Sequence, residues 1–182
     1  EVISAGKIGS FLHVTDPEEA NLLQSYATES RLGIPLLIGI DAIHGNGLVR
    51  GATIYPSPIT MASSWNLDLV RQSSVETARE VRANGAQWTF TPNIDIARDP
   101  RWGRGGETFG EDDFLVAEMG VAVIDGLQQG DFDEDGQVVA TAKHFIAGGD
   151  PSNGLNLSPM DLSIRSLRED HFPPFERAID AG

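Results

Sequence analysis

The sequence has no cysteine, few basic residues and no long apolar run. The absence of cysteine excludes disulfide bonds, thiolate metal sites and a cysteine nucleophile. No apolar stretch approaches the roughly 18 residues of a membrane-spanning helix, so the sequence predicts no membrane partner. With 13 basic residues against 27 acidic ones, the net charge is −14. A chain without a basic face is a poor partner for the phosphate backbone, so we expect no nucleic-acid partner.

The 182 residues, 40% of them hydrophobic, suffice for one domain with a core. The chain begins at Glu1 without a methionine and stops at Gly182, just as a helical pattern ends. We therefore expect a piece of a longer protein, cut at both ends.

Short apolar runs alternate with longer helical patterns along the chain. The runs predicted to be strands cover residues 7–14, 35–40, 87–91 and 138–142. The helical patterns that follow them cover 17–32, the segment from an N-cap at Asn66 to a stop at Gly85, 112–127, and a segment starting near Ser163. Pro173 and Pro174 are expected to break the last helix and start a short second one. Four strand–helix units predict a parallel α/β fold, either a doubly wound sheet or half of an eight-fold barrel.

Polar side chains follow the predicted strands directly. Asp41 follows the second strand, the segment 95–107 (DIARDPRWGRGGE) follows the third, and Lys143 and His144 follow the fourth. Because the carboxyl ends of parallel strands meet at one edge, we expect these residues on one rim. Asp accepts hydrogen bonds from vicinal hydroxyls, and Arg and Lys donate to hydroxyl oxygens, so the set suits a polyhydroxylated ligand. On the residues alone, an Asp41 that caps a turn fits equally well.

A family resemblance adds to this interpretation. Its segments are, in order, IGIDAIHGNG, GATIYPSPITMASSWN, TPNIDIARDPRWGRGGETFGED, ATAKHF and LREDHFPPFERAIDAG. Together they resemble the first domain of glycoside hydrolase family 3, the β-glucosidases and related exo-glycosidases, over essentially all of residues 1–182. The resemblance implies the N-terminal half of a (β/α)8 TIM-like barrel, truncated, with the remaining strands and the following domain absent.

The resemblance also implies an activity and a site. It implies a retaining β-glucosidase that removes terminal β-D-glucosyl residues from β-linked glucosides or oligosaccharides, without a cofactor. Asp41, Arg104, Lys143 and His144 would hold the terminal sugar in the −1 subsite. The nucleophile and the acid/base would lie beyond Gly182. Because retaining glycosidases need two carboxyl groups roughly 5–5.5 Å apart, the chain alone is expected to be inactive.

Other functions stay open beside this one. The first alternative is a catalytically inactive carbohydrate-binding barrel, which nothing within these residues separates from the enzyme. A phosphate-binding α/β enzyme is disfavoured by the acidic charge and by the missing phosphate loop. Gly148 stands where the N-acetylglucosaminidase branch of the family carries a histidine, so the resemblance favours the glucosidase, xylosidase and glucan glucohydrolase branches. Family members of this kind are often periplasmic or secreted, which we expect here.

Several further residues have a structural interpretation. A network that holds the long loop is predicted from Arg98, Asp99, Arg101 and Glu107. Trp102 is expected to pack beneath that loop, and His44 to be a structural histidine, while His13 and His171 carry no signal. The acidic segment that starts at Asp131 is interpreted as a solvated turn, because it lacks the ligand spacing of a calcium loop. No metal site is predicted.

Overall fold

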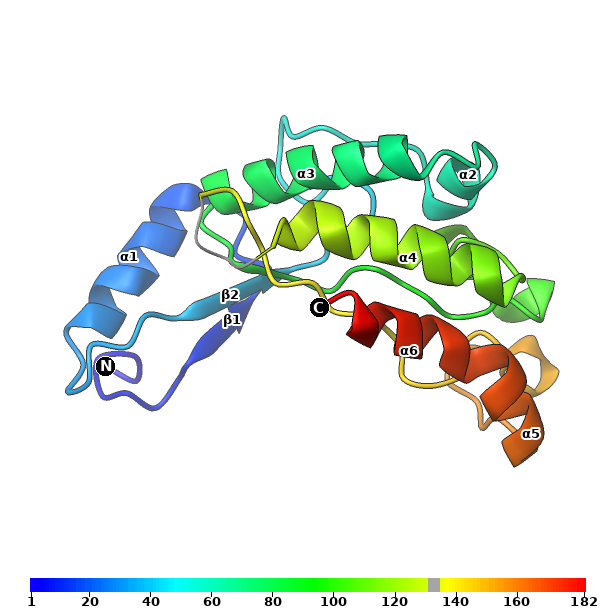
Figure 1. The fold of residues 1–182 in the computed structure, drawn as a ribbon. Helices are drawn as coiled ribbons and strands as arrows, with labels where there is room; N and C mark the ends of the chain where they lie inside the picture. Colours follow the sequence, from blue (N-terminus) through cyan, green and yellow to red (C-terminus); the bar gives the residue numbers. More distant parts are fainter. Residues whose placement is uncertain (131–134) are drawn as a thin grey trace.

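The computed structural model describes residues 1–130 and 135–182, with a small parallel sheet at its centre (Figure 1). Strands β1 (Ser10–Leu12), β2 (Leu37–Ile40) and β3 (Trp88–Thr89) are hydrogen-bonded in the order β1-β2-β3, all parallel. The predicted parallel α/β fold is therefore confirmed. The predicted turn at Asp131 begins outside the described residues.

The fourth predicted strand, 138–142, is wrong as a regular strand but right in position. The chain there runs parallel to β3 and makes isolated bridges from Val139 to Trp88 and from Lys143 to Asn93. Between these bridges the ladder is irregular, because the successive carbonyls of Thr91 and Pro92 both accept hydrogen bonds from the fourth segment, whereas in a regular strand successive carbonyls point to opposite sides. The backbone N–H of Lys143 still donates to the Pro92 carbonyl at 3.0 Å. The order of parallel segments is thus sequential, from β1 through β3 to this fourth segment.

The long helices begin at side-chain caps. Their bounds are α1 (Pro17–Thr28), α3 (Leu67–Ala83) and α4 (Asp113–Gln128). Asp16, Asn66 and Asp112 each accept a hydrogen bond from a backbone N–H of the first turn. The predicted N-cap at Asn66 is confirmed, whereas α1 ends four residues short of the expected Leu32. The expected loop between β2 and α3 contains a short helix, α2 (Pro58–Ala62), with Pro58 in its first turn.

The C-terminal helix is distorted where a break was expected. Ser163 caps α5 (Ile164–Ser166), the π-helical segment η4 (Leu167–His171) follows, and α6 (Phe172–Asp180) continues directly. The backbone N–H of Phe172 donates to the Leu167 carbonyl, five residues back. The expected second short helix is α6, and both prolines lie in its first turn, but the π turn joins it to α5 where a break was predicted. Proline is tolerated in a first helical turn, because the N–H groups there have no partner within that helix.

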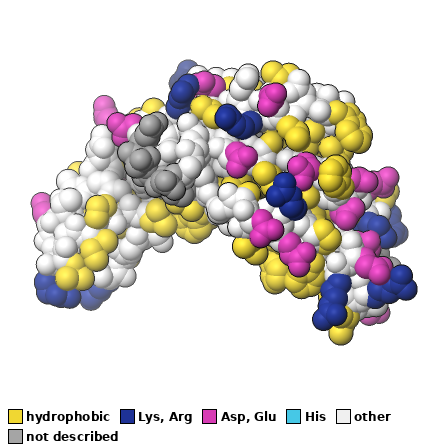
Figure 2. Space-filling view, viewed as in Figure 1, with side chains coloured by type: hydrophobic (Ala, Val, Ile, Leu, Met, Phe, Trp, Pro, Cys, Tyr) yellow, Lys and Arg dark blue, Asp and Glu magenta, His cyan; other side chains and the backbone are white. Residues whose placement is uncertain are grey.

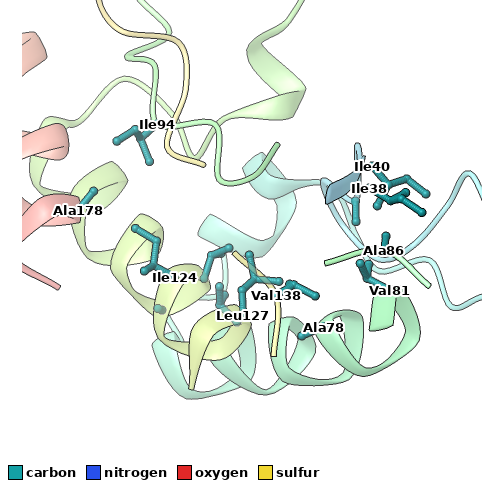
Figure 3. Packing of buried hydrophobic residues seen from close by; sticks show 14 of the residues in the cluster. Ile38, Ile40, Ala78, Val81, Ala86, Ile94, Ile124, Leu127, Val138 and Ala178 are labelled. Carbon is teal, nitrogen blue, oxygen red and sulfur yellow. The ribbon is translucent and has the colours of Figure 1, made fainter. Parts of the chain in front are cut away.

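The core lies between the sheet and a layer of adjacent helices. In Figure 1, α3 and α4 lie side by side, and α6 lies beside α4, as the contacts between these helices also indicate. Ile38 and Ile40 of β2 are fully buried and lie near Val81 and Ala86 (Figure 3). Leu127 of α4 lies near Val138 of the fourth segment in the same view. The isoleucines of β2 therefore point toward the helices.

The opposite face of the sheet is open. Register pairs Leu12 with Gly39 and Gly39 with Trp88, so these residues share the face that Ile38 and Ile40 do not occupy. On this face Leu12 is 60% exposed, Leu37 40% and Val139 42%. A parallel sheet normally has both faces covered. The described residues cover only one face of this sheet.

Side-chain amides hold the strands near their amino-terminal ends. The amide of Gln24 exchanges two hydrogen bonds of 2.8 Å with the backbone of Leu36. The Oε1 atoms of Gln87 and Gln128 accept from the backbone N–H groups of Ile38 and Ala140. These neutral groups satisfy backbone donors that the short ladders leave unpaired.

Candidate functional site

The carboxyl ends of the parallel segments bring the four predicted site residues together. Asp41 follows β2 directly, Lys143 and His144 end the fourth segment, and Arg104 lies in the loop after β3. Hydrogen bonds link Asp41 to Lys143, and Arg104 to His144. The structure adds His13, the residue after β1, and Asp95 from the chain that follows β3.

Asp41 is held by two donors, one on each carboxylate oxygen. Lys143 Nζ donates to Oδ1 at 3.0 Å, and the side chain of Lys143 is only 14% exposed. His13 Nε2 lies 3.0 Å from Oδ2. Asp41 itself is a third exposed, so its remaining lone pairs can meet a ligand.

His144 links a buried carboxylate to a guanidinium. Its Nδ1 lies 2.7 Å from Oδ2 of Asp95, a side chain with no exposed surface, and its Nε2 lies 3.3 Å from Nη2 of Arg104. A guanidinium has only donors, so Nε2 must accept the hydrogen bond from Arg104. Nδ1 then carries the ring hydrogen and donates to Asp95. This chain of contacts fixes the orientation of the imidazole ring.

Glu107 binds the guanidinium of Arg104 through two hydrogen bonds. Nε and Nη2 of the guanidinium donate to the two carboxylate oxygens at 2.9 and 2.7 Å, a bidentate pair. These bonds lower the pKa of Glu107, although partial burial opposes the shift, and they raise the pKa of Arg104. The guanidinium also lies 5.7 Å from the ring centre of Trp102. Arg104 is therefore held in one position, with a quarter of its side chain exposed.

The remaining loop residues have structural contacts. Trp102 is 3% exposed and donates from Nε1 to Asn156, so the prediction that it packs beneath the loop is confirmed. Arg101 pairs with Asp99, and Arg98 lies 3.8 Å from Asp170. Of the predicted network, Glu107 is the member that belongs to the site rather than to the loop alone.

The other two histidines have polar partners outside the set of rim residues. Nδ1 of His44 lies 2.7 Å from the Tyr55 carbonyl, a structural contact, as predicted. His171 is buried, and burial lowers the pKa of its ring, with Asp150 at 3.8 Å.

Gly148 lies against the buried carboxylate. A Cβ atom at this position would come within 3.0 Å of Asp95 Oδ1 and 3.2 Å of Oδ2. Oδ1 has no hydrogen-bond partner among the described residues. Any side chain at residue 148 would therefore displace Asp95 or itself, and glycine is the residue that leaves the Asp95–His144 contact undisturbed.

The arrangement places hydrogen-bond acceptors and donors side by side, and hydroxyl groups need both kinds of partner. Arg104 and His144 line an open groove of ≈ 420 Å³, and Asp41 and Lys143 offer an acceptor beside a donor. Within residues 1–130 and 135–182, no three His, Asp or Glu side chains are grouped as metal ligands would be. Nor does any helix in these ranges combine the length and the apolarity of a bilayer crossing.

Two residues of the rim were not predicted from the sequence as site residues. His13 had no functional signal in the sequence, and Asp95 was only the first letter of a polar segment. Both, like Asp41, lie close after a parallel strand, and that position is the signal by which they could have been found.

Comparisons with known proteins agree on one family. The profile described as glycosyl hydrolase family 3 N terminal domain matches residues 1–182. The chain is 42% identical over 172 residues to a β-xylosidase of Formosa agariphila, covering 90% of this chain and 24% of that protein. It is 34% identical over 183 residues to a periplasmic β-glucosidase of Salmonella typhimurium, covering 100% and 23%.

Solved structures give the same answer. A β-glucosidase involved in saponin metabolism from intestinal bacteria superimposes with a TM-score of 0.92 at 44% identity, covering 97% of this chain and 24% of that one. The chain thus spans about a quarter of the length of these relatives.

Proposed function

The chain belongs to glycosyl hydrolase family 3, and from that membership we propose that it forms the sugar-binding part of a retaining exo-β-glycosidase. In this proposal Asp41, Arg104, Lys143 and His144 hold the terminal sugar in the −1 subsite. The nucleophile and the acid/base come from chain outside these 182 residues. The substrates are β-linked glucosides or oligosaccharides, and the enzyme is periplasmic or secreted.

One observation carries the proposal: a carboxylate, two cationic side chains and an imidazole lie together at one rim, joined in pairs. Asp41 with Lys143, and Arg104 with His144, present a carboxylate, an ammonium, a guanidinium and an imidazole at the ends of parallel segments. A sugar ring offers neighbouring hydroxyls, each both donor and acceptor, and such a mixed set can satisfy them. Because the side chains are already held by one another, little ordering is needed when a sugar binds.

The hydrogen bonds and pKa shifts of the rim carboxylates support the proposal that the catalytic carboxyl groups come from other parts of the protein. A glycosidase acid needs a pKa raised toward neutrality. Glu107 has a lowered pKa because Arg104 binds its charged form. Asp95 is buried against His144, and both oxygens of Asp41 have donors. The carboxylates described at this rim therefore suit binding and positioning rather than acid catalysis.

The sheet supports half of a (β/α)8 barrel rather than a doubly wound fold. A doubly wound sheet reverses its strand order at a switch point, with helices on both faces. Here the parallel segments follow in chain order, and α3, α4 and α6 follow one another in the same way. The open face with Leu12, Leu37 and Val139 would become the barrel interior once further strands close the sheet.

The preferred substrate is a β-glucoside, with a β-xyloside as the closest competitor. Relatives of both kinds cover this chain. A second function, sugar binding without hydrolysis, fits the same rim, because the catalytic carboxyls are not among its residues.

The test measures hydrolysis of aryl β-glucoside and aryl β-xyloside by the longer protein that carries this chain. Replacing Asp41 with Ala removes the acceptor and leaves Lys143 unpaired, so we expect kcat/KM to fall at least about a hundredfold. Asp161→Ala, at an exposed position outside the rim, is the matched control and should leave kcat/KM within about twofold. A folded protein that binds glucose but hydrolyses neither substrate would favour the binding-only function.

A further inference from the structure

His13 occupies an unusual backbone position at the end of β1. Its φ angle is 58°, in the left-handed region that side chains other than glycine rarely adopt. Its backbone N–H donates to the Gly39 carbonyl of β2 at 2.8 Å. The hydrogen bond to β2 stabilises a turn that points the ring along the rim instead of continuing the alternation of the strand. Such a conformation costs free energy and persists where its surroundings hold it.

Among the described residues, the hydrogen-bond partner of the His13 ring is the carboxylate of Asp41. Nε2 lies 3.0 Å from Oδ2, and since a carboxylate only accepts, Nε2 carries the proton. Lys143 donates to the other oxygen from the fourth segment, which lies beyond β3, whereas His13 lies at the end of β1 on the other side of β2. With a donor on each oxygen, the carboxylate of Asp41 cannot rotate without losing a hydrogen bond. Each oxygen keeps lone-pair capacity for a ligand hydroxyl.

We propose that His13 is a positioning residue that fixes the plane of the Asp41 carboxylate for sugar binding. The inference rests on the proposed function of Asp41 and goes beyond it, since it assigns a role to the end of β1. The contact is partly exposed, with 38% of the His13 side chain in solvent, and exposed ion pairs contribute little to stability. Its effect therefore falls on ligand recognition rather than on folding.

The test compares two amide substitutions in the longer protein that carries this chain. The side-chain nitrogen of glutamine can reach the place of Nε2, whereas that of asparagine can reach only the place of Nδ1, short of Asp41. We expect His13→Gln to keep kcat/KM for aryl β-glucoside within about threefold. We expect His13→Asn to lower it about ten- to a hundredfold, the loss of one hydrogen bond to a charged group.

Two further measurements separate positioning from a general structural effect. In a double-mutant cycle with Asp41→Asn, the loss from His13→Asn should nearly disappear, because the carboxylate that it positions is already gone. Lys7→Ala, at an exposed residue on the amino-terminal side of β1 and so at the opposite end of the strand from His13, is the control and should leave kcat/KM unchanged. Equal activities of the two amide variants, or additive losses in the cycle, would overturn the inference.

The wild-type protein distinguishes this failure from failure of the proposed function. If the wild type hydrolyses the substrate and the two amide variants have the same kcat/KM, only the role of His13 is contradicted. If the wild type hydrolyses nothing but binds glucose, the same pair of variants is compared by glucose affinity, with the same expected ratio. A wild type that neither hydrolyses nor binds sugars would overturn both.

Discussion

At the scale of single residues, the rim is organised as pairs that hold one another. Glu107 holds Arg104, Asp95 holds His144, and His13 and Lys143 hold Asp41. A side chain fixed by a partner keeps its place when the ligand is absent. The free-energy cost of ordering these side chains then falls on folding, and a smaller cost remains when a ligand binds.

The Glu107–Arg104 pair predicts a pH dependence of stability. The pKa of Glu107 is lowered in the folded state, so the pair stabilises the fold above the ordinary glutamate pKa of 4.5. The contribution is lost as the pH falls through the lowered value. We expect Glu107→Gln to lower the Tm by about 1–3 °C at pH 7 and by less at pH 3, measured by thermal unfolding of the longer protein. A difference in Tm that is the same at both pH values would contradict this account.

The rim could be predicted where a pattern in the adjacent sequence marks a residue. Contacts between residues far apart in the sequence could not be predicted. Asp41, Lys143 and His144 could be predicted because each directly follows an apolar run, and Arg104 because it lies in a specific motif. His13 could not be singled out, since its role depends on the register of β1 against β2 and on a positive φ angle. The bond between Arg104 and His144 joins residues 40 positions apart and needs the folded sheet.

At the scale of elements, α3 and α4 approach each other at a glycine. A Cβ atom on Gly126 of α4 would collide with the backbone carbonyl of Arg71 and lie 2.6 Å from Cβ of Ser74 in α3. Gly120 has the same function toward Ile94, whose Cγ2 lies 2.6 Å from such a Cβ. Glycine lets α4 pack closely on α3 at Gly126 and on the segment after β3 at Gly120, and it costs helix propensity in return.

Gly126→Ala is expected to destabilise the fold by about 1–3 kcal/mol, because the added methyl group forces the two helices apart. Helix propensity alone predicts the opposite sign, a gain of about 1 kcal/mol. Denaturant unfolding of the longer protein measures which effect dominates. Gly9→Ala, where a Cβ would meet nothing within 4 Å, serves as the matched control. A stabilised Gly126→Ala variant would show that the contact between the helices is looser than described.

Elements with a clear period and a cap were predictable, and elements shaped by their neighbours were not. The N-caps Asn66 and Ser163 stand in the sequence as helix starts, and both cap helices. The short helix α2 was missed because five residues carry too little period. The fourth strand lost its regular ladder where Thr91 and Pro92 of the neighbouring segment both accept from it, which no pattern within 138–142 could reveal.

At the scale of the whole molecule, the described residues cover one side of the sheet and leave the other side open. Leu12, Leu37 and Val139 are exposed on its open face, and in Figure 2 hydrophobic side chains also lie among the charged ones on the visible surface. β1 and the fourth segment are edges with unpaired backbone groups in the described chain. Both features favour association with other chains or with further strands.

The 182-residue chain by itself is therefore expected to aggregate or to be molten in solution. We expect it to bind the apolar dye ANS and to unfold over a broad range of temperature, as loosely packed states do. Light scattering and thermal unfolding followed by circular dichroism measure both properties, with the longer protein as the control. A sharp cooperative transition of the monomeric chain would contradict the expectation, and with it the argument for a half barrel.

The two ends of the parallel sheet differ in the kind of polar group that holds them. Gln24, Gln87 and Gln128 bind the backbone near the amino ends of the strands with neutral amides. At the carboxyl ends the bonds join charged groups, such as Lys143 to Asp41. Dissolved ions screen charges but leave neutral amide contacts nearly unchanged. We therefore expect a higher ionic strength to weaken the contacts at the carboxyl ends while the amide contacts at the amino ends keep their strength, so affinity for the proposed sugar ligand should respond to salt before the fold does.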